Sequence, residues 1–107
     1  MTVGSGDTLY CWVYLDSAHL PSEIMLTWTD ETLSGEHRAY WGANNLLYGT
    51  DGTASRYHIG ALPSAGVWTK LSIPASAVDL GGRSLTGMGF ALYGGGATWD
   101  LAGKTTP

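Results

Sequence analysis

One stretch of this chain alternates between aliphatic and aromatic side chains, and this alternation restricts what the chain can fold into. Between Leu9 and Leu15, small or aliphatic residues are interleaved with Tyr10, Trp12 and Tyr14. Successive side chains of a β-strand point to opposite faces of its sheet, so such a strand has one aliphatic and one aromatic face. A core needs only one of them. The second face is therefore either covered by further structure or open to a partner.

The rest of the sequence is typical of short strands separated by turns. Sixteen of the 107 residues are glycine, five are tryptophan and only 13% are charged, which favours strands over helices. The expected strands span residues 7–15, 23–29, 36–41, 46–48, 55–59, 67–73, 85–93 and 97–101. A helical turn is expected over 75–80, with Ser76 as its N-cap. About six to eight strands predict one all-β domain, an antiparallel β-sandwich or jelly roll over residues 1–107, with tails at 1–6 and 102–107.

Charge and cysteine content exclude several classes of function. The net charge is −4 and the five basic residues are scattered, so no basic patch is available for a nucleic-acid backbone. No apolar run approaches the ~20 residues that span a membrane, and the first four residues do not resemble a signal peptide. The single cysteine, Cys11, cannot form an internal disulfide and is expected to be a buried, small hydrophobic residue.

Motifs for catalysis are not found. His19, His37 and His58 are widely spaced and form neither H-x-H nor H-E-x-x-H, and no G-x-S-x-G sequence occurs. None of the nine acidic residues stands out as a glycosidase pair. We therefore expect neither an enzyme nor a cofactor. A structural calcium is the one metal considered, and its candidate ligands are Asp7, Asp51 and Asp100.

Four segments of the chain resemble a β-sandwich domain of large bacterial multidomain surface proteins. They are GDTLYCWVYLD, EIMLTWTD followed by EHRAYWG, YGTDGTASRYHIGALPSAGVWTKLSIPASAVDL and GMGFALYGGGATWDLAG. Domains of this type, in RHS-repeat-like and planctomycete proteins, are lectin-like or carbohydrate-binding-like units. The chain is also loosely similar to jelly-roll carbohydrate-binding modules. That similarity rests on G-x-W-x-x-L-x-I-P at Gly66 to Pro74, the glycine-rich strand that follows, and W-D at Trp99 and Asp100.

The resemblance implies an extracellular or cell-surface setting within a larger bacterial protein, with a poly- or oligosaccharide as partner. The scattered basic residues and the lack of a long apolar run argue against nucleic acid and membrane as partners. Such domains carry a strand before the GDTL segment, whereas only Met1 to Gly6 precede that segment here. A missing N-terminal edge strand would leave a sheet edge exposed, and an exposed edge invites a homodimer by strand pairing.

Sugar binding offers a physical use for exposed rings, because the C–H face of a pyranose lies flat on Trp or Tyr. The expected stacking platform is Tyr10, Trp12 and Tyr14, with Tyr93 at its flank. Further ligand contacts are expected from the strand near residue 40 and the loop after it: Arg38, Tyr40 and Trp41, with Glu36, Asn44, Asn45 and Asp51 as additional polar partners. If the glycine-bearing strand over 85–93 lies beside the platform, its glycines form a floor.

Three interpretations of the aromatic strand face stay open: a ligand platform, a face covered by a loop or missing strand, and a self-association surface. Trp28, Trp68 and Trp99 have aliphatic partners in their strands and are expected in the core or at its rim. The sequence predicts a non-catalytic carbohydrate-binding module that recruits a larger protein to a glycan. The alternative is a structural or self-association domain that uses the same face as a subunit contact.

Overall fold

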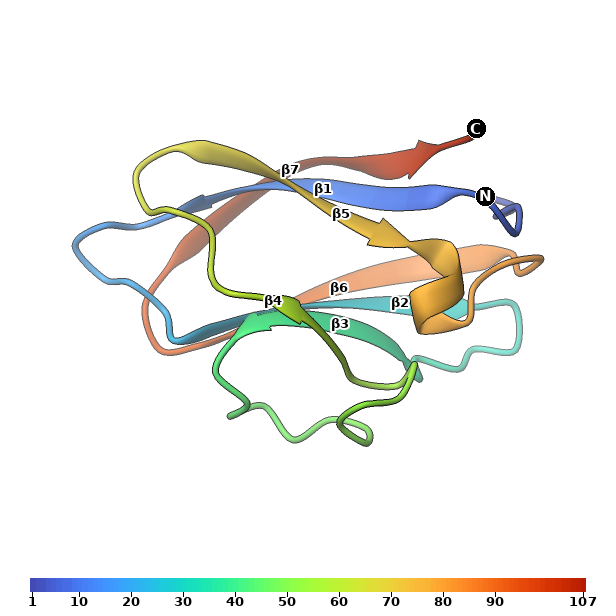
Figure 1. The fold of residues 1–107 in the computed structure, drawn as a ribbon, viewed down its shortest axis with the longest axis horizontal. Helices are drawn as coiled ribbons and strands as arrows, with labels where there is room; N and C mark the ends of the chain where they lie inside the picture. The colour runs from blue at the N-terminus through green and yellow to red at the C-terminus, as the bar shows by residue number, and fades with distance from the viewer.

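The computed structural model describes all residues from Met1 to Pro107 as seven β-strands and one short 3₁₀ turn (Figure 1). The strands are β1 (Thr8–Leu15), β2 (Glu23–Asp30), β3 (His37–Gly42), β4 (Tyr57–Gly60), β5 (Trp68–Pro74), β6 (Leu85–Tyr93) and β7 (Ala97–Thr105). The 3₁₀ turn η1 (Ala75–Val78) follows β5. The all-β class expected from the sequence is confirmed, and the strand over 85–93 has the bounds that were predicted.

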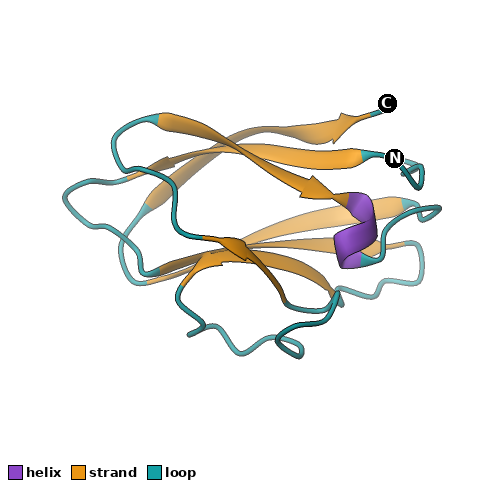
Figure 2. Ribbon diagram, in the orientation of Figure 1, coloured by secondary structure: helices purple, strands orange, loops and turns teal.

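The strands form two sheets that lie one above the other (Figures 1 and 2). The upper sheet has the order β5-β1-β7, and the lower sheet has the order β4-β3-β2-β6. Neighbouring strands are antiparallel except β3 and β4, which are parallel. Strand β6 pairs with β2 rather than β1. The suggestion that its glycines lie beside the aromatic strand is therefore wrong.

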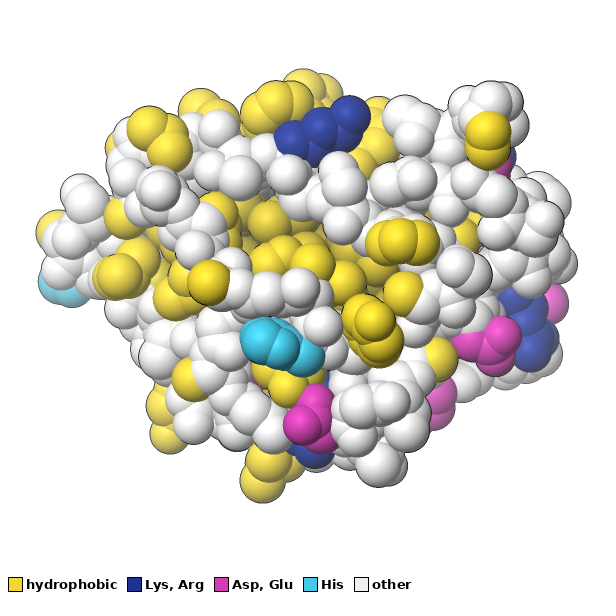
Figure 3. Space-filling model, viewed as in Figure 1, with side chains coloured by type: hydrophobic (Ala, Val, Ile, Leu, Met, Phe, Trp, Pro, Cys, Tyr) yellow, Lys and Arg dark blue, Asp and Glu magenta, His cyan; other side chains and the backbone are white.

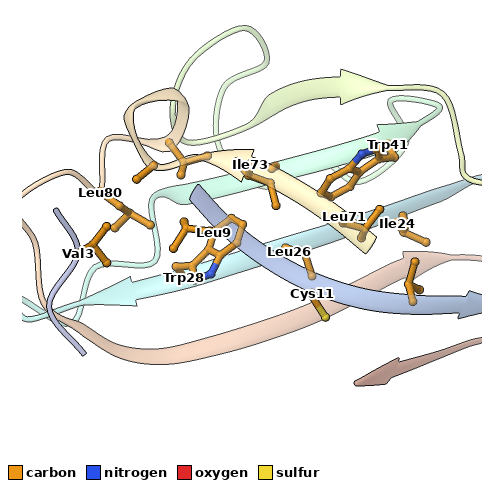
Figure 4. Packing of buried hydrophobic residues seen from close by; sticks show 14 of the residues in the cluster. Val3, Leu9, Cys11, Ile24, Leu26, Trp28, Trp41, Leu71, Ile73 and Leu80 are labelled. Atoms are coloured by element: carbon orange, nitrogen blue, oxygen red, sulfur yellow. The ribbon is translucent and has the colours of Figure 1, made fainter. Parts of the chain in front are cut away.

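The core lies between the two sheets and consists of the inward side chains of each strand (Figure 4). From β1 and β2 the inward hydrophobic side chains are Leu9, Cys11, Val13, Leu15, Ile24, Leu26 and Trp28. Leu71 and Ile73 of β5 and Trp41 of β3 complete this layer. Cys11 is buried as expected, and burial raises the pKa of its thiol. Each buried Leu or Ile contributes about 1.5 to 3 kcal/mol relative to an exposed one.

The two ends of the chain are packed onto the domain and do not form the expected tails. Val3 is fully buried, and its amide donates to the Arg83 carbonyl at 2.8 Å. Strand β7 continues through Thr105, past the expected end at residue 101. The ammonium of Lys104 donates to Asp7 at 2.6 Å, which fastens the end of β7 to the start of β1.

Two smaller expectations also differ from the structure. Residues 46–48 form no strand and belong to a long loop over 43–56, which joins β3 to β4. Ser76 does not cap the helical turn, because the N-cap position of η1 is Pro74 and no side chain bonds the first amides. Pro74 is the last residue of β5, with a φ of −57° and a ψ of 129°, and it has no amide hydrogen to satisfy where β5 passes into η1.

Candidate functional site

The outward face of the upper sheet carries an uncovered row of aromatic rings. Tyr10, Trp12 and Tyr14 alternate along β1 with its buried side chains, and each ring is partly exposed. Because β1 is the middle strand of the sheet, the rings lie at the centre of the face. Figures 1 and 2 show no strand or loop beyond this sheet on its outward side. The two-faced strand is confirmed, and no strand or loop of this chain covers its aromatic side.

A fourth ring, that of Trp68 in β5, extends the row. The Cα of Trp68 pairs with that of Tyr14, and their ring centroids lie 5.7 Å apart at an interplanar angle of 52°. The Trp68 residue is 48% exposed. The sequence placed it in the core or at its rim, but Leu71 and Ile73 are the inward residues of β5. Strand alternation then puts Trp68 on the outward side. We call these four rings the aromatic face: Tyr10, Trp12, Tyr14 and Trp68.

The aromatic face contains a shallow hollow of about 330 Å³. Its lining consists of Trp12, Trp68, Asp100 and Leu101. Asp100 lies across from Trp12 on β7, where the register between β1 and β7 shifts and Leu101 has a φ of 48°. Figure 3 shows hydrophobic side chains gathered over the upper sheet around a basic side chain. The hollow therefore combines two flat apolar rings with a carboxylate at its border.

Tyr10 contacts its own sheet on two sides. The Lys70 ammonium lies 4.6 Å from the centroid of the Tyr10 ring, within cation–π range. Gly103 of β7 is paired with Tyr10, and a Cβ at that position would come within 2.8 Å of the Tyr10 hydroxyl oxygen. The ring therefore lies against a strand that has no side chain there, with a lysine over it. Trp12 and Trp68 are the rings available for stacking.

A second hollow, of about 340 Å³, lies beside Tyr14. Its lining is more polar and consists of Tyr14, Asp16, Gly96, Ala97 and Thr98. One carboxylate oxygen of Asp16 accepts the Ala18 amide at 2.9 Å, and its other oxygen accepts no hydrogen bond from the chain. Because Tyr14 borders this hollow and Trp68 borders the first, the Tyr14–Trp68 pair joins the two.

The other predicted ligand residues lie elsewhere. Arg38 and Tyr40 are on the outward side of the lower sheet, beneath the 43–56 loop. Trp41 is 5% exposed and belongs to the core, and Tyr93 ends β6 in the lower sheet. The structure therefore does not bring these four residues to Tyr10, Trp12 and Tyr14. Strand β3 pairs with β2 rather than β1, so a shared alternation pattern carries no information about proximity.

Arg38 and Tyr40 anchor the 43–56 loop. The Tyr40 hydroxyl donates to Asp51 at 2.6 Å. Burial, together with this bond to a carboxylate, raises the pKa of Tyr40 to about 12. The Arg38 guanidinium donates to Glu36 at 2.9 Å and to the Ser55 carbonyl at 3.2 Å. The Tyr40 hydroxyl and the Arg38 guanidinium therefore form their hydrogen bonds within the fold.

Glu23 completes this polar layer under the loop. It is fully buried on the outward side of the lower sheet, and its Oε1 accepts the amides of Asn45 and Leu46 at 2.6 and 2.7 Å. The Asn44 side chain donates to Asp51 at 3.3 Å. The polar residues that the sequence offered as sugar contacts thus hold a loop against the lower sheet.

The acids considered for calcium do not assemble into a site. Asp7 is bound by Lys104, and this hydrogen bond lowers the pKa of the Asp7 carboxyl. Asp51 is bound by Tyr40 on the lower sheet, and Asp100 accepts the amide that follows it on β7. The structure contains no group of three His, Cys, Asp or Glu residues placed to hold a metal ion.

One buried histidine–carboxylate pair is present, and it is fully used within the fold. The Nε2 of His37 lies 2.8 Å from Asp30, and its Nδ1 lies 2.7 Å from the Val78 carbonyl oxygen. The hydrogen bond from the Thr32 hydroxyl, followed by that from His37, lowers the pKa of Asp30 far below its usual range. The pair ties β2 and β3 to η1, and neither ring nitrogen is left for proton transfer.

Sequence reasoning did not assign Trp68 or Leu101 to the site, and it did not name Asp16, Thr98 or Asp100 as ligand contacts. The signal for Trp68 was present, because it shares strand parity with Lys70 and Ser72, while Leu71 and Ile73 have the opposite parity. Leu101 gave no comparable signal, because its exposure depends on the shifted register between β1 and β7.

Comparisons with known proteins identify no relative of this chain. No protein-family model, no curated protein and no solved structure matches this chain. None of the structure's helical segments has the length and hydropathy needed to cross a bilayer.

Proposed function

We propose that this chain is a non-catalytic carbohydrate-binding module that stacks sugar rings on the aromatic face. The observation that carries the proposal is the open row of four rings on one sheet, with Trp12 and Trp68 lining a single hollow. Leaving such rings in water forgoes the free energy that their burial would contribute to folding. A partner that covers them recovers it. A pyranose is suited to this because its C–H face is flat and apolar.

The borders of the face supply the polar groups that sugar hydroxyls need. Asp100 borders the first hollow, and Asp16 and Thr98 border the second. Both hollows fall within the range of roughly 300 to 1,000 Å³ that is usual for small-molecule sites. Because they are shallow, we expect weak binding, with a Kd of about 10 µM to 1 mM, equivalent to roughly −7 to −4 kcal/mol.

The setting of the domain belongs to the same proposal. The resemblance to bacterial surface proteins suggests that the module recruits a larger extracellular or cell-surface protein to a poly- or oligosaccharide. The finer fold description, a jelly roll, is proposed with it. What supports the fold description is the arrangement of two facing sheets.

Single-ring variants test the proposal. Trp12→Ala and Trp68→Ala should each weaken binding to a retained polysaccharide about 5- to 30-fold, because a buried aromatic contact contributes on the order of 1 to 2 kcal/mol. The measurement is affinity electrophoresis in polysaccharide gels, with circular dichroism as a check on folding. Tyr93→Ala is the matched control, because this ring is 51% exposed but lies on the lower sheet. Equal retention of all three variants would contradict the proposal.

The second candidate function uses the same four rings as a contact with another protein chain. The observation that favours it is again their exposure, since exposed apolar patches also mark subunit contacts. In that case no polysaccharide would retard the domain, and Trp12→Ala would dissociate an oligomer in sedimentation experiments. These outcomes separate the two functions in one set of variants.

A further inference from the structure

Strand β6 is the one edge strand in this molecule that lacks the usual protection against pairing with a strand of another chain. The two sheets end in four edge strands, β5, β7, β4 and β6. Native edges are blunted by charged residues, prolines, bulges or short length. Strand β7 has Asp100, Lys104 and a register shift, β5 has Lys70 and ends at Pro74, and β4 is four residues long.

From residue 87 onward, β6 contains no charged residue, no proline and no bulge that would protect its edge. No charged residue, histidine or proline occurs between Arg83 and Asp100. Met1 to Val3 pair with the residues that lead into β6, as shown by the antiparallel bridge between Thr2 and Ser84. From residue 87 to residue 93, no strand of this chain lies on the side of β6 away from β2. That stretch therefore presents unpaired backbone groups.

An exposed apolar side chain lies on the same stretch. Phe90 is 46% exposed, and its ring packs against Trp99 of β7 with centroids 5.0 Å apart. Met88 and Leu92 share its side of the strand, whereas Gly87, Gly89 and Ala91 occupy the other side. This edge strand thus has one face with bulky apolar side chains and one face with very small residues.

We propose that β6 pairs with β6 of a second copy of this chain, antiparallel and centred on Phe90, which joins the two lower sheets into one eight-stranded sheet. In an antiparallel pair, directly opposed residues point to the same face. Centring on Phe90 sets Phe90 against its own copy, Met88 against Leu92 and Gly89 against Ala91. It also sets Gly87 against Tyr93, an aromatic–glycine pair of the kind that supports edge glycines.

The self-matching of this strand favours a second copy over a different protein. Within residues 88–92, bulky residues meet bulky residues and small residues meet small ones, and the pair outside them sets glycine against tyrosine. No like charges meet, because the segment carries no charge. The same pairing of β7 with its own copy would add Asp100 and Lys104 to the contact. The β6 contact uses the lower sheet, so the aromatic face on the upper sheet remains free in the dimer.

The experiment compares two lysine substitutions at exposed apolar positions on different edges. Sedimentation equilibrium of the wild-type chain should give the mass of two chains, and Phe90→Lys should reduce it to one. Leu101→Lys on β7 is the matched control, because Leu101 is 68% exposed and its edge is already protected. This control should remain a dimer.

Three outcomes would overturn the proposal: a monomeric wild-type chain, a Phe90→Lys variant that remains dimeric, or a Leu101→Lys variant that dissociates. If Phe90→Lys does not fold by circular dichroism, hydrogen exchange of the wild-type chain decides instead. Amides of residues 87–93 should then become more protected as protein concentration rises, and unchanged protection would reject the pairing. Polysaccharide retention by Phe90→Lys tests the aromatic face separately, since that variant leaves Trp12 and Trp68 intact.

Discussion

Trp12 and Tyr10 point to the same side of one strand, yet their surroundings give them different roles. Trp12 lines the hollow beside Trp68 and has open space above it. Tyr10 has the Lys70 ammonium over its ring and Gly103 beneath its hydroxyl. We therefore expect Trp12 to carry ligand stacking, and Tyr10 to hold Lys70 in position at the border of the face.

Two glycine substitutions test how closely Tyr10 lies on the sheet. A Cβ at Gly103 would come within 2.8 Å of the Tyr10 hydroxyl oxygen, whereas a Cβ at Gly89 would meet only Thr27 at 3.9 Å. Gly89→Ala should be stabilising by about 0.4 to 1 kcal/mol, because the unfolded chain loses freedom. Gly103→Ala should be less stable than Gly89→Ala by about 1 to 3 kcal/mol, because the ring must move. Urea unfolding measures both, and equal stability would show that Tyr10 does not lie where we describe it.

Sequence patterns predicted the positions of some exposed side chains but not of others. The alternation along residues 9–15 predicted the exposed rings of β1, because one buried face is enough for a core. The same rule applied to residues 67–73 identifies Trp68 as outward, although its aliphatic neighbours suggested packing. Arg38 and Tyr40 could not be placed in this way. Alternation gives the face of a strand within its own sheet but not which sheet the strand belongs to.

At the scale of elements, the 43–56 loop takes the place of a strand or helix on the outward side of the lower sheet. It buries Met25, Tyr40 and Glu23 there. The Glu23 carboxyl group replaces the pairing that a neighbouring strand would give to the amides of Asn45 and Leu46. Residues 46–48, despite their apolar sequence, form no strand, and the Leu46 amide is bound by Glu23 instead.

Removing the Glu23 carboxyl group should therefore loosen the loop. Glu23→Ala should lower the free energy of unfolding by about 1 to 3 kcal/mol, because two amides lose their acceptor. Glu36→Ala is the matched control, since the Glu36 side chain is 61% exposed and pairs with Arg38 at the surface. Its cost should be at most about 1 kcal/mol. Denaturant unfolding of the two variants measures the difference, and similar costs would mean that the loop is held by other contacts.

Most element positions followed from local sequence, and the exceptions have physical causes. The alternation and flanking turns of residues 85–93 fixed β6 at both ends. Strand β7 was predicted too short because Leu101, with its φ of 48°, interrupts the alternation before Lys104. The order of strands depends on contacts between distant segments, so the pairing of β6 with β2 could not be foreseen.

At the scale of the whole molecule, two buried carboxylates make the domain sensitive to acid. Asp30 joins β2 to His37, and Asp7 joins β1 to Lys104 of β7. Hydrogen bonds lower the pKa of both groups below their unfolded values, so the unfolded chain takes up protons first as pH falls. The stabilisation is complete above about pH 4, near the unfolded carboxyl pKa, and is lost progressively below it.

Unfolding free energy measured by urea at a series of pH values checks this behaviour. The wild-type chain should lose stability as pH falls below about 4, and Asp30→Asn should reduce the steepness of that loss because no carboxyl remains to titrate. Asparagine can still accept the Thr32 bonds with its side-chain oxygen and has nearly the size of aspartate, so the variant is expected to fold. Parallel curves for the two proteins below that pH would show that Asp30 does not contribute.

The facing sheets leave one broad aromatic surface in contact with water, and we propose that this surface binds sugars. The most direct measurement is a glycan screen that follows intrinsic tryptophan fluorescence, because Trp12 and Trp68 line the proposed site. We predict that at least one poly- or oligosaccharide changes the emission saturably in the wild-type chain, and that the change disappears in the Trp12→Ala/Trp68→Ala double variant. A saturable change that persists in the double variant, or no change with any glycan, would contradict the account.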